Sequence, residues 1–439
     1  MRNLAGSGDA FPRIARGWQC HCGDAGAGLP LTRDVADIFR RGLGPAGKEA
    51  LGLAVSGGGD SLAMLYLAVE AGCDVAVATV DHGLRPEAAV EAAEVAAICA
   101  GLGVPHEILH WHWDGAGNLQ DAARRGRMAL LADWARRRGL RTVALGHTED
   151  DIAETFLMRL ARDAGVDGLA AMAARREVAG VVFLRPLLGA SRADLRAWLL
   201  GRGLPWADDP SNEDDRFDRV RARRALAAMA EVGAGGAEIA ALAAKMADVR
   251  AALEAATADA AARILRVDAG DVIVDAVGLA ALPAEIRRRL LLAALIWIAS
   301  ADYGPRGAEM ERFVAAALEG RPATLAGCKT SHARGRMRVT RELRAVAGLE
   351  CPADALWDGR WRVSGPETNG LTLRALGEGG LVACPDWRAA AHPRATLLAS
   401  PSVWRGAVLV AAPLAGFGAG WTAQCQPPKG PLGAAPLSH

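Results

Sequence analysis

A glycine-rich turn at residues 56–61 is the feature of the sequence that most constrains the fold. It stands between an apolar run of strand length, Leu51–Val55, and a helical pattern, Leu62–Glu70. Backbone amides at such a turn, together with the N-terminus of the following helix, form a cradle for an anion. Glycines permit positive φ and close approach of a ligand, and the hydroxyls of Ser56 and Ser61 can donate to phosphate oxygens. The turn therefore predicts a phosphate-binding site at the start of a helix.

The residues after this turn alternate between runs of strand length and helical patterns. Apolar runs cover Val75–Val80, Thr142–Leu145 and Val181–Leu184, and helical patterns cover Pro86–Leu102 and Leu119–Arg138. Strands that alternate with helices form βαβ units and a parallel sheet that is covered by helices on both faces. We therefore expect an α/β domain that ends near residue 225.

The turn lacks two other signatures of nucleotide-binding loops. No Gly-Lys-Ser/Thr sequence follows the glycines, which disfavours a kinase or GTPase of the Walker type. The spacing also differs from the Gly-x-Gly-x-x-Gly pattern of dinucleotide-binding folds. A plain glycine-rich turn is the remaining alternative, and the two serines and the acid within the turn weigh against it.

Length and composition bound the number of domains and the class of protein. A chain of 439 residues is too long for one ordinary domain, so two or three are expected. The net charge of +1 argues against nucleic-acid binding through bulk charge alone. The longest apolar run, Leu290–Ala299, is about half of what a membrane span requires, so no membrane association is expected. The eight cysteines form no Cys-x-x-Cys pair, which disfavours a zinc ribbon or a disulfide framework and fits a reducing cytoplasm.

Changes in composition divide the chain into four segments. Residues 1–45 are rich in Gly and are predicted to be a poorly ordered extension with one helix near Asp34–Arg41. Residues 46–225 carry the α/β pattern. Residues 226–345 are rich in Ala, Leu and Arg at helical spacing, and we expect a mainly helical domain with a short strand at Val272–Val274. Residues 346–439 are rich in Gly, Pro and Trp and are predicted to form a small mixed or β-rich domain with a frayed tail.

Polar residues follow two further strands of the predicted sheet. The second strand ends in Asp81 and His82, and the third is followed by His147, Asp150 and Asp151. Ligands of open α/β sheets bind at the carboxyl ends of the strands. Carboxylates there can hold Mg²⁺ against phosphates or accept a proton from an attacking amine. The alternative is that acids in the first turn of a helix only stabilise that helix through its macrodipole.

Arginines supply candidate contacts to phosphates. Arg124 and Arg127 are three residues apart and share one face of the predicted helix, so they can clamp a phosphate together. Residues 216–224 hold five arginines on another predicted helix, which could bind RNA phosphates. A solvated helix face is the alternative in both cases, and a general preference for arginine codons is an alternative reason for the excess of arginine over lysine.

Together these motifs resemble those of the N-type ATP pyrophosphatases and, within that superfamily, the tRNA(Ile)-lysidine synthetase family. The resemblance rests on Ser-Gly-Gly-x-Asp-Ser at 56–61, Val-Asp-His-Gly-Leu-Arg at 80–85, Gly-His-x-x-Asp-Asp-x-x-Glu-Thr at 146–155 with its continuation to 172, Arg-Pro-Leu-Leu at 185–188 and Asp-Pro-Ser-Asn at 209–212. It covers residues 50–225 well, is weaker over 225–345 and is faint beyond. The chain departs from the family pattern at Met128, Ile152, Asp163 and Val220.

The resemblance implies a parallel-sheet PP-loop ATPase domain and an ATP-dependent ligase. Such an enzyme adenylates the wobble cytidine of a tRNA(Ile) with a CAU anticodon and joins free L-lysine to its C2 atom, with release of pyrophosphate and AMP. ATP and Mg²⁺ are the implied cofactors, and a homodimer is among the assemblies that the sequence leaves open. The alternatives are a tRNA thiolase or another adenylating amidoligase, and a tRNA-binding module without catalytic activity.

The candidate site residues fall into four groups by implied role. The catalytic group consists of Asp60, His147, Asp150 and Asp151, and Asp151 is favoured among these carboxylates as the general base. The ATP-binding group consists of Ser56, Gly57, Gly58, Gly59, Asp60, Ser61, Asp81 and His82. The tRNA- or substrate-binding group consists of Arg124, Arg127, Glu154, Arg159, Arg162, Arg219 and Arg221. The candidates for Mg²⁺ are Asp60 and Asp151.

Overall fold

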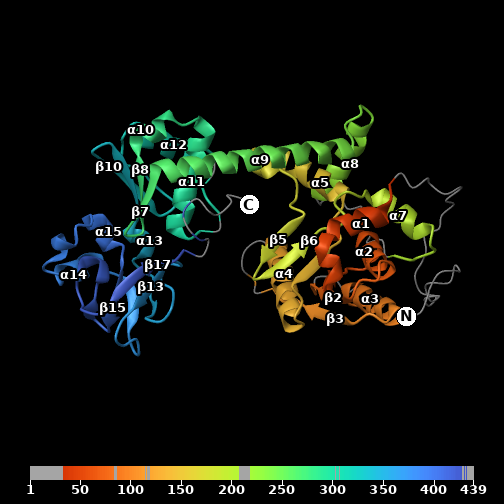
Figure 1. Ribbon diagram of the computed structural model, residues 1–439, viewed down its shortest axis with the longest axis horizontal. Helices are drawn as coiled ribbons and strands as arrows, with labels where there is room; N and C mark the ends of the chain where they lie inside the picture. The colour runs from red at the N-terminus through yellow and green to blue at the C-terminus, as the bar shows by residue number, and fades with distance from the viewer. Residues whose placement is uncertain are drawn as a thin grey trace. The chain divides into compact units, whose positions relative to one another are not determined.

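Two compact units make up the chain. The structure is a computed structural model that describes residues 33–83, 87–113, 115, 119–206, 218–301, 303–305, 307–427, 430 and 432. The first unit comprises residues 1–247 and the second residues 248–439, so the division falls inside the long helix α9 (Gly236–Ile264; Figure 1). The first 32 residues and the predicted Asp-Pro-Ser-Asn turn at 209–212 lie outside the described residues.

A six-stranded sheet forms the centre of the first unit. Its order is β3-β2-β1-β4-β6-β5, and all neighbouring strands are parallel except β5 and β6. From β1 the chain continues to β2 and β3 on one side and returns to β4 on the other, so the strand order reverses between β1 and β4. Ligands of open α/β sheets bind at the carboxyl ends of the strands at such a reversal. The strands are β1 (Leu51–Ala54), β2 (Val75–Asp81), β3 (His106–His110), β4 (Thr142–Leu145), β5 (Arg175–Val178) and β6 (Val181–Leu184).

Four of these strands confirm the sequence analysis, and two were not predicted. The predicted runs correspond to β1, β2, β4 and β6. Strands β3 and β5 lie at the two edges of the sheet, where one side of the strand has no neighbour and polar residues are tolerated. Their residues are accordingly mostly half-buried or exposed, so neither strand has an apolar run to reveal it.

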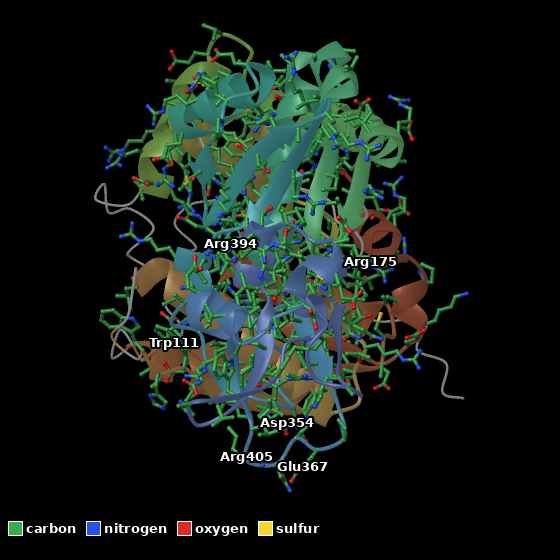
Figure 2. All side chains as sticks on the ribbon, turned by 90° about the vertical axis from the view of Figure 1, so that its left-hand side faces the viewer. Trp111, Arg175, Asp354, Glu367, Arg394 and Arg405 are labelled. Atoms are coloured by element: carbon green, nitrogen blue, oxygen red, sulfur yellow. The ribbon has the colours of Figure 1, made fainter. Side chains whose placement is uncertain are left out.

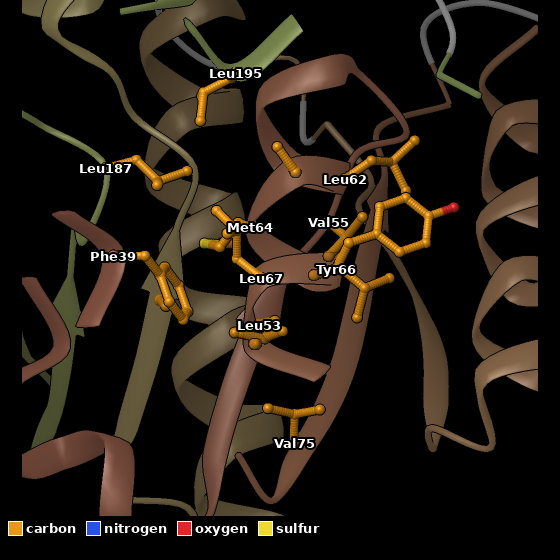
Figure 3. Close-up of a cluster of buried hydrophobic side chains, with 14 of the residues drawn as sticks. Phe39, Leu53, Val55, Leu62, Met64, Tyr66, Leu67, Val75, Leu187 and Leu195 are labelled. Atoms are coloured by element: carbon orange, nitrogen blue, oxygen red, sulfur yellow. The ribbon is translucent and has the colours of Figure 1, made fainter. Parts of the chain in front are cut away.

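Helices cover both faces of the sheet. One hydrophobic cluster joins β1 to α1 (Val35–Leu43), α2 (Gly59–Glu70), α3 (Glu87–Leu102) and α7 (Arg192–Leu200), and Figure 3 shows a part of it. A second cluster joins the sheet to α4 (Leu119–Arg137). Successive residues of a strand point to opposite faces. Accordingly Leu53 belongs to the first cluster and Ala54 to the second, while a Cβ on Gly52 would approach the Trp134 ring of α4 to 2.8 Å.

The helix predicted near Asp34–Arg41 belongs to this core. Asp34 begins helix α1 by accepting hydrogen bonds from the amides of Ala36 and Asp37, both at 3.0 Å. Phe39 is fully buried and lies within the cluster drawn in Figure 3. The predicted extension of residues 1–45 therefore ends in a helix that packs into the first unit.

Three helices pack on one another beside this sheet. The cluster between α5 (Glu149–Leu160), α8 (Asp218–Ala230) and the beginning of α9 includes Ile152, Phe156 and Leu226. Ile152, one of the departures from the family pattern, is thus a packing residue. The boundary predicted at residue 225 falls within α8, whose packing belongs to the first unit. A short helix, α6 (Val166–Leu169), follows α5.

The second unit combines helices with antiparallel strands. Its larger sheet has the order β7-β8-β11-β10-β9 and packs against α11 and α12. The short strand predicted at Val272–Val274 is confirmed as part of β8. The elements are β7 (Leu265–Asp268), β8 (Asp271–Asp275), α10 (Ala276–Ala281), α11 (Ala284–Ala299), α12 (Gly307–Leu318), β9 (Thr324–Leu325), β10 (Cys328–Ala333) and β11 (Arg336–Arg341).

The remaining residues form the small β-rich region that their composition predicts. They build a four-stranded sheet of order β12-β14-β15-β16 and the pair β13-β17. The elements are α13 (Leu343–Val346), β12 (Cys351–Pro352), β13 (Trp361–Ser364), β14 (Thr372–Ala375), α14 (Gly377–Val382), α15 (Arg394–Leu398), β15 (Pro401–Arg405), β16 (Val408–Ala411) and β17 (Thr422–Cys425). Within the described part of the chain, no helix has both the length and the apolar character that a bilayer crossing requires.

Candidate active site

The glycine-rich turn joins β1 to α2 and is closed by its own serines. The hydroxyl of Ser61 donates to the carbonyl of Gly58 at 2.9 Å and accepts from the amide of Ser56 at 3.1 Å. Gly57 has a φ of +90°, which a residue with a side chain rarely adopts. The first amides of a helix have no intrahelical partner, and no described side chain caps α2. Those amides are therefore available to an anion at the reversal point of the sheet.

The end of β4 lies directly against the start of α2. A Cβ on Gly146 would come within 3.0 Å of Cα of Ser61 and 3.2 Å of the carbonyl oxygen of Asp60. A side chain at this position would crowd these backbone atoms, so glycine favours the close approach. The turn after β1 and the acids after β4 are consequently neighbours, as the sequence analysis requires.

Arg192, the first residue of α7, connects the acids of two helices. Its guanidinium lies 3.1 Å from the carboxylate of Asp60, 3.0 Å from that of Glu154 and 3.6 Å from that of Asp151. Burial disfavours the charge of Arg192, but the three carboxylates outweigh it and raise the pKa of Arg192. Burial raises the pKa of Asp60, and the charge of Arg192 counteracts this rise. The backbone amide of Arg192 donates to Asp150 at 2.6 Å, so Asp150 holds α5 against the start of α7.

Asp151 and Glu154 each use one carboxylate oxygen for structure. Oδ2 of Asp151 accepts from the amide and hydroxyl of Thr148, at 2.9 and 3.2 Å, and so caps α5. Its Oδ1 faces Arg192 and, at 3.9 Å, Arg219.

Glu154 is 1% exposed, and its Oε1 accepts from Arg192 and, at 2.7 Å, from Arg223. Its Oε2 is buried without a hydrogen-bond partner among the described residues.

His147 is held in one neutral form. Nε of Arg185 donates to Nδ1 of His147 at 3.1 Å, and a guanidinium can only donate. Burial lowers the pKa of His147 to about 4, although the charge of Asp151 acts in the opposite direction. The ring is therefore neutral at pH 7 with its proton on Nε2, which makes His147 a hydrogen-bond donor at the end of β4.

Positive charge gathers near His147. Burial, together with the charges of Arg219 and Arg124, lowers the pKa of Arg127 on α4. The charge of Arg127 in turn contributes to the lowered pKa values of His82 and His147, after the larger effect of burial. Neither Arg124 nor Arg127 forms an ion pair with a described carboxylate. Such a group of unneutralised arginines is suited to phosphate.

Four other predicted site residues form hydrogen bonds or ion pairs with the backbone or with a neighbouring helix. The carboxylate of Asp81 accepts from the amide of Gly83 at 2.8 Å, which fixes the turn after β2. Arg159 donates to the carbonyl of Gly168 at 2.8 Å. Arg162 and Arg221 both contact Asp218 of α8, the former at 2.7 Å. These contacts orient α5, α6 and α8 and do not involve the acids beside Arg192.

Arg185 and Arg192 were not among the candidate site residues, and Arg223 was included only as part of the arginine-rich run at 216–224. Arg185 comes directly after β6 and Arg192 a few residues later, so both follow the carboxyl end of a strand, as the acids after β4 do. That position was the available signal for them. Arg223 stands in a run of arginines, and no local signal distinguishes it from its neighbours.

Comparisons with known proteins give a consistent result. A family model described as a PP-loop domain matches residues 31–230. The chain is 50% identical to the tRNA(Ile)-lysidine synthase of Ruegeria pomeroyi, over 93% of this chain and 99% of that protein. It is 42% identical to the tRNA(Ile)-lysidine synthase of Novosphingobium aromaticivorans, over 72% of this chain and 96% of that protein. It is 41% identical to that of Zymomonas mobilis, over 68% of this chain and 90% of the relative.

Proposed function

This chain belongs to the tRNA(Ile)-lysidine synthase family, and from that premise we propose that it ligates lysine to the wobble cytidine of a tRNA(Ile) with a CAU anticodon. The chain is a ligase with a PP-loop ATP-binding domain. The observation that carries the assignment of its active site is the contact of Arg192 with Asp60, Asp151 and Glu154, directly beside the glycine-rich turn.

ATP binds with its β- and γ-phosphates on the turn between β1 and α2. The amides at the start of α2 and the exposed hydroxyl of Ser56 are its donors, whereas the hydroxyl hydrogen of Ser61 already serves Gly58. His147 offers Nε2–H to a phosphate oxygen. Asp81 and His82, at the end of β2, face the adenosine. The α-phosphorus then lies at the reversal point of the sheet, where the RNA base enters.

Mg²⁺ fits the donors of this site. No described group of three or more His, Cys, Asp or Glu residues has the arrangement of a metal site. Mg²⁺, however, usually takes only one or two carboxylates and completes its coordination with phosphates and water. Asp60 and Asp151 would hold the ion, and its chemistry is to neutralise phosphate charge during the displacement of pyrophosphate.

Adenylation makes C2 of the cytidine electrophilic. The C2 oxygen attacks the α-phosphorus, a new P–O bond forms, and pyrophosphate leaves with the electrons of the broken bond. Arg124, Arg127 and Arg219 hold the RNA phosphates and stabilise the negative charge that develops. Positioning and charge stabilisation are the main contributions of such a site. Because the wobble base is in a single-stranded loop, it can leave its stack at modest cost.

Lysine then displaces AMP. Its ε-ammonium is attracted by Oε2 of Glu154, which has no hydrogen-bond partner in the described part of the chain, and by Asp151. Oδ1 of Asp151, which Thr148 does not use, accepts the proton as the ε-nitrogen attacks C2 and the C2–O bond to AMP breaks. The helix-capping bonds of Asp151 hold the carboxylate in place for this step.

The cysteines disfavour a thiolase. Thiolates are the reactive form, and activated cysteines have lowered pKa values. Burial raises the pKa of all six described cysteines, which are Cys73, Cys99, Cys328, Cys351, Cys384 and Cys425. None of them suits sulfur transfer.

The decisive experiment incubates the protein with ATP, radiolabelled lysine and an unmodified tRNA(Ile) transcript that bears CAU. Label should enter this RNA, with release of AMP and pyrophosphate, and should not enter the same transcript bearing GAU. Incorporation that requires sulfide or glutamine in place of lysine would overturn the proposal.

The variant Asp151→Asn separates catalysis from binding. Its amide oxygen can still accept from Thr148, so α5 remains capped while the proton acceptor is lost. We expect turnover to fall by about 10²-fold or more, the scale of general-base catalysis, with tRNA affinity unchanged. Asp163→Asn is the matched control, because Asp163 is exposed, has a φ of +54° that Asn tolerates, and should keep full activity.

A further inference from the structure

Trp111 stands at the same edge of the sheet and has no place in the reaction described so far. It follows β3 directly, and its amide donates to the carbonyl of Asp81 at 2.9 Å, which extends the pairing of β3 with β2. The residue is labelled in Figure 2. The backbone of Trp111 is therefore fixed beside the proposed adenosine site, and the residue is half-buried.

The indole lies against the backbone of α4 at Gly126. A Cβ on Gly126 would come within 2.0 Å of Nε1 and 2.3 Å of Cδ1 of Trp111, so no side chain fits between them. Glycine is among the poorest helix formers, and Gly126 stands inside the 19-residue helix α4. The contact with Trp111 supplies the reason for a glycine at this position.

Gly126 lies between the two arginines that carry the proposed phosphate contacts. Arg124 precedes it by two residues and Arg127 follows it directly. Trp111 also contacts His82 edge to face, with the ring centroids 5.9 Å apart. The charge of Arg127 affects the same histidine. One indole thus touches both the end of β2 and the helix that bears the arginines.

We infer that Trp111 is a positioning residue for tRNA binding, which sets the place of Arg124 and Arg127 relative to the nucleotide through its contact with Gly126. The inference rests on the proposed function. A residue that is rigidly attached to β3 and touches the α4 backbone determines how far the arginine-bearing turn of α4 lies from the sheet edge. Displacing the indole therefore moves both arginines, because Gly126, which the indole contacts, lies between them in α4.

A double-mutant cycle tests this inference. Trp111→Ala and Gly126→Ala should each raise KM for the tRNA by about tenfold, the scale of coupling between contacting residues, with kcat changed far less. Trp111→Phe, which keeps a ring on Gly126, should recover part of the loss. In the Trp111→Ala background Gly126→Ala should cause no further loss, because the side chain with which its methyl group collides is gone.

The outcomes separate this inference from the proposed function. If the wild-type protein incorporates no lysine, the proposed function fails whatever the variants do. If it incorporates lysine but the two substitutions multiply in their effect on KM, the inference is overturned. Variants that unfold at lower temperature while their KM for tRNA stays at the wild-type value would also overturn it, because the contact would then serve stability alone.

Discussion

The side chain of Arg192 brings the acids of two helices together in one site. Its guanidinium contacts Asp60 of α2 together with Asp151 and Glu154 of α5. Removing one partner of a buried ionic group leaves the others without compensation, and this loss generally costs more than the intact group contributes. Three carboxylates gathered around a single cation are therefore more sensitive to the loss of that cation than any single ion pair on the surface.

We predict that Arg192→Ala lowers the free energy of unfolding of the first unit by about 2–4 kcal/mol, somewhat below the range for fully buried pairs because Arg192 is partly exposed. Urea denaturation measures this change. Arg41→Ala is the matched control, since the exposed Arg41 pairs with Asp37 one turn earlier in α1, at 3.0 Å, and its loss should cost at most about 1 kcal/mol. Equal losses in the two variants would contradict the role given to Arg192.

His147 predicts a pH dependence of stability. Its folded-state pKa of about 4 lies below its ordinary value of 6.5, so between these values the unfolded chain binds the proton and the folded protein does not. The contribution of His147 to stability is complete above pH 6.5 and is lost progressively as the pH falls toward 4. Asp60, whose pKa burial raises, acts in the opposite direction at the lower end of this window.

Comparing wild type with His147→Gln isolates the histidine, because Asp60 is common to both proteins. Between pH 6.5 and 4 the free energy of unfolding of the wild type should fall more steeply than that of the variant. Parallel stability curves, measured by urea denaturation at several pH values, would show that His147 is not buried in its neutral form.

At the scale of elements, α4 presents two kinds of arginine. Arg125 is 65% exposed in its side chain and pairs with Asp121 one turn earlier, at 3.3 Å. Arg124 and Arg127 have no such described partner, and Arg127 shares its electrostatic environment with His147 and Arg219. Helix periodicity thus divides these three arginines by role. Arg125 forms a solvent-exposed ion pair with Asp121, and Arg124 and Arg127 are candidate phosphate contacts.

We predict that Arg124→Ala and Arg127→Ala each weaken tRNA binding and reduce the slope of log Kd against log salt by roughly one, as expected for a lost phosphate contact. Filter binding at several salt concentrations measures both quantities. The same substitution at Arg125 removes an equal charge from the same helix, and it should leave the slope almost unchanged. A slope that falls equally in all three variants would indicate attraction by bulk charge.

At the scale of the whole molecule, each unit has a core of its own. The first unit is built around the parallel sheet, with Phe39 and Leu53 among its fully buried residues. The second has a separate cluster around α11 and the antiparallel sheet, with Leu295 among its fully buried residues. Units with independent cores unfold as independent cooperative units unless their interface is large.

Calorimetry should therefore show two transitions, and ATP with Mg²⁺ should raise only the one that belongs to the first unit, because a ligand stabilises what it binds. Phe39→Ala should lower that transition and Leu295→Ala the other, each by about 2–5 kcal/mol of unfolding free energy. A single transition that responds to both substitutions would show that the two units unfold together.

The sequence alone determined the local structure of the first unit and the place of its phosphate-binding turn. Strands β1, β2, β4 and β6 are apolar runs, and α1 to α4 carry helical periodicity, so each could be predicted from residues that are close along the chain. The turn at 56–61 could be predicted for the same reason, because glycines and serines act on their own backbone. Strands β3 and β5 were missed, because edge strands do not need an apolar pattern.

Tertiary structure alone decided how the charged residues divide their roles. Arg192 lies 132 residues from Asp60 and 38 from Glu154 along the chain, and Arg223 lies 69 from Glu154. Asp150 and Asp151 are neighbours of the same chemistry, yet one holds the start of α7 and the other caps α5 with one oxygen left for the site. The partner of a charged side chain depends on which elements meet in space, and that is settled by the packing of apolar faces on both sides of the sheet.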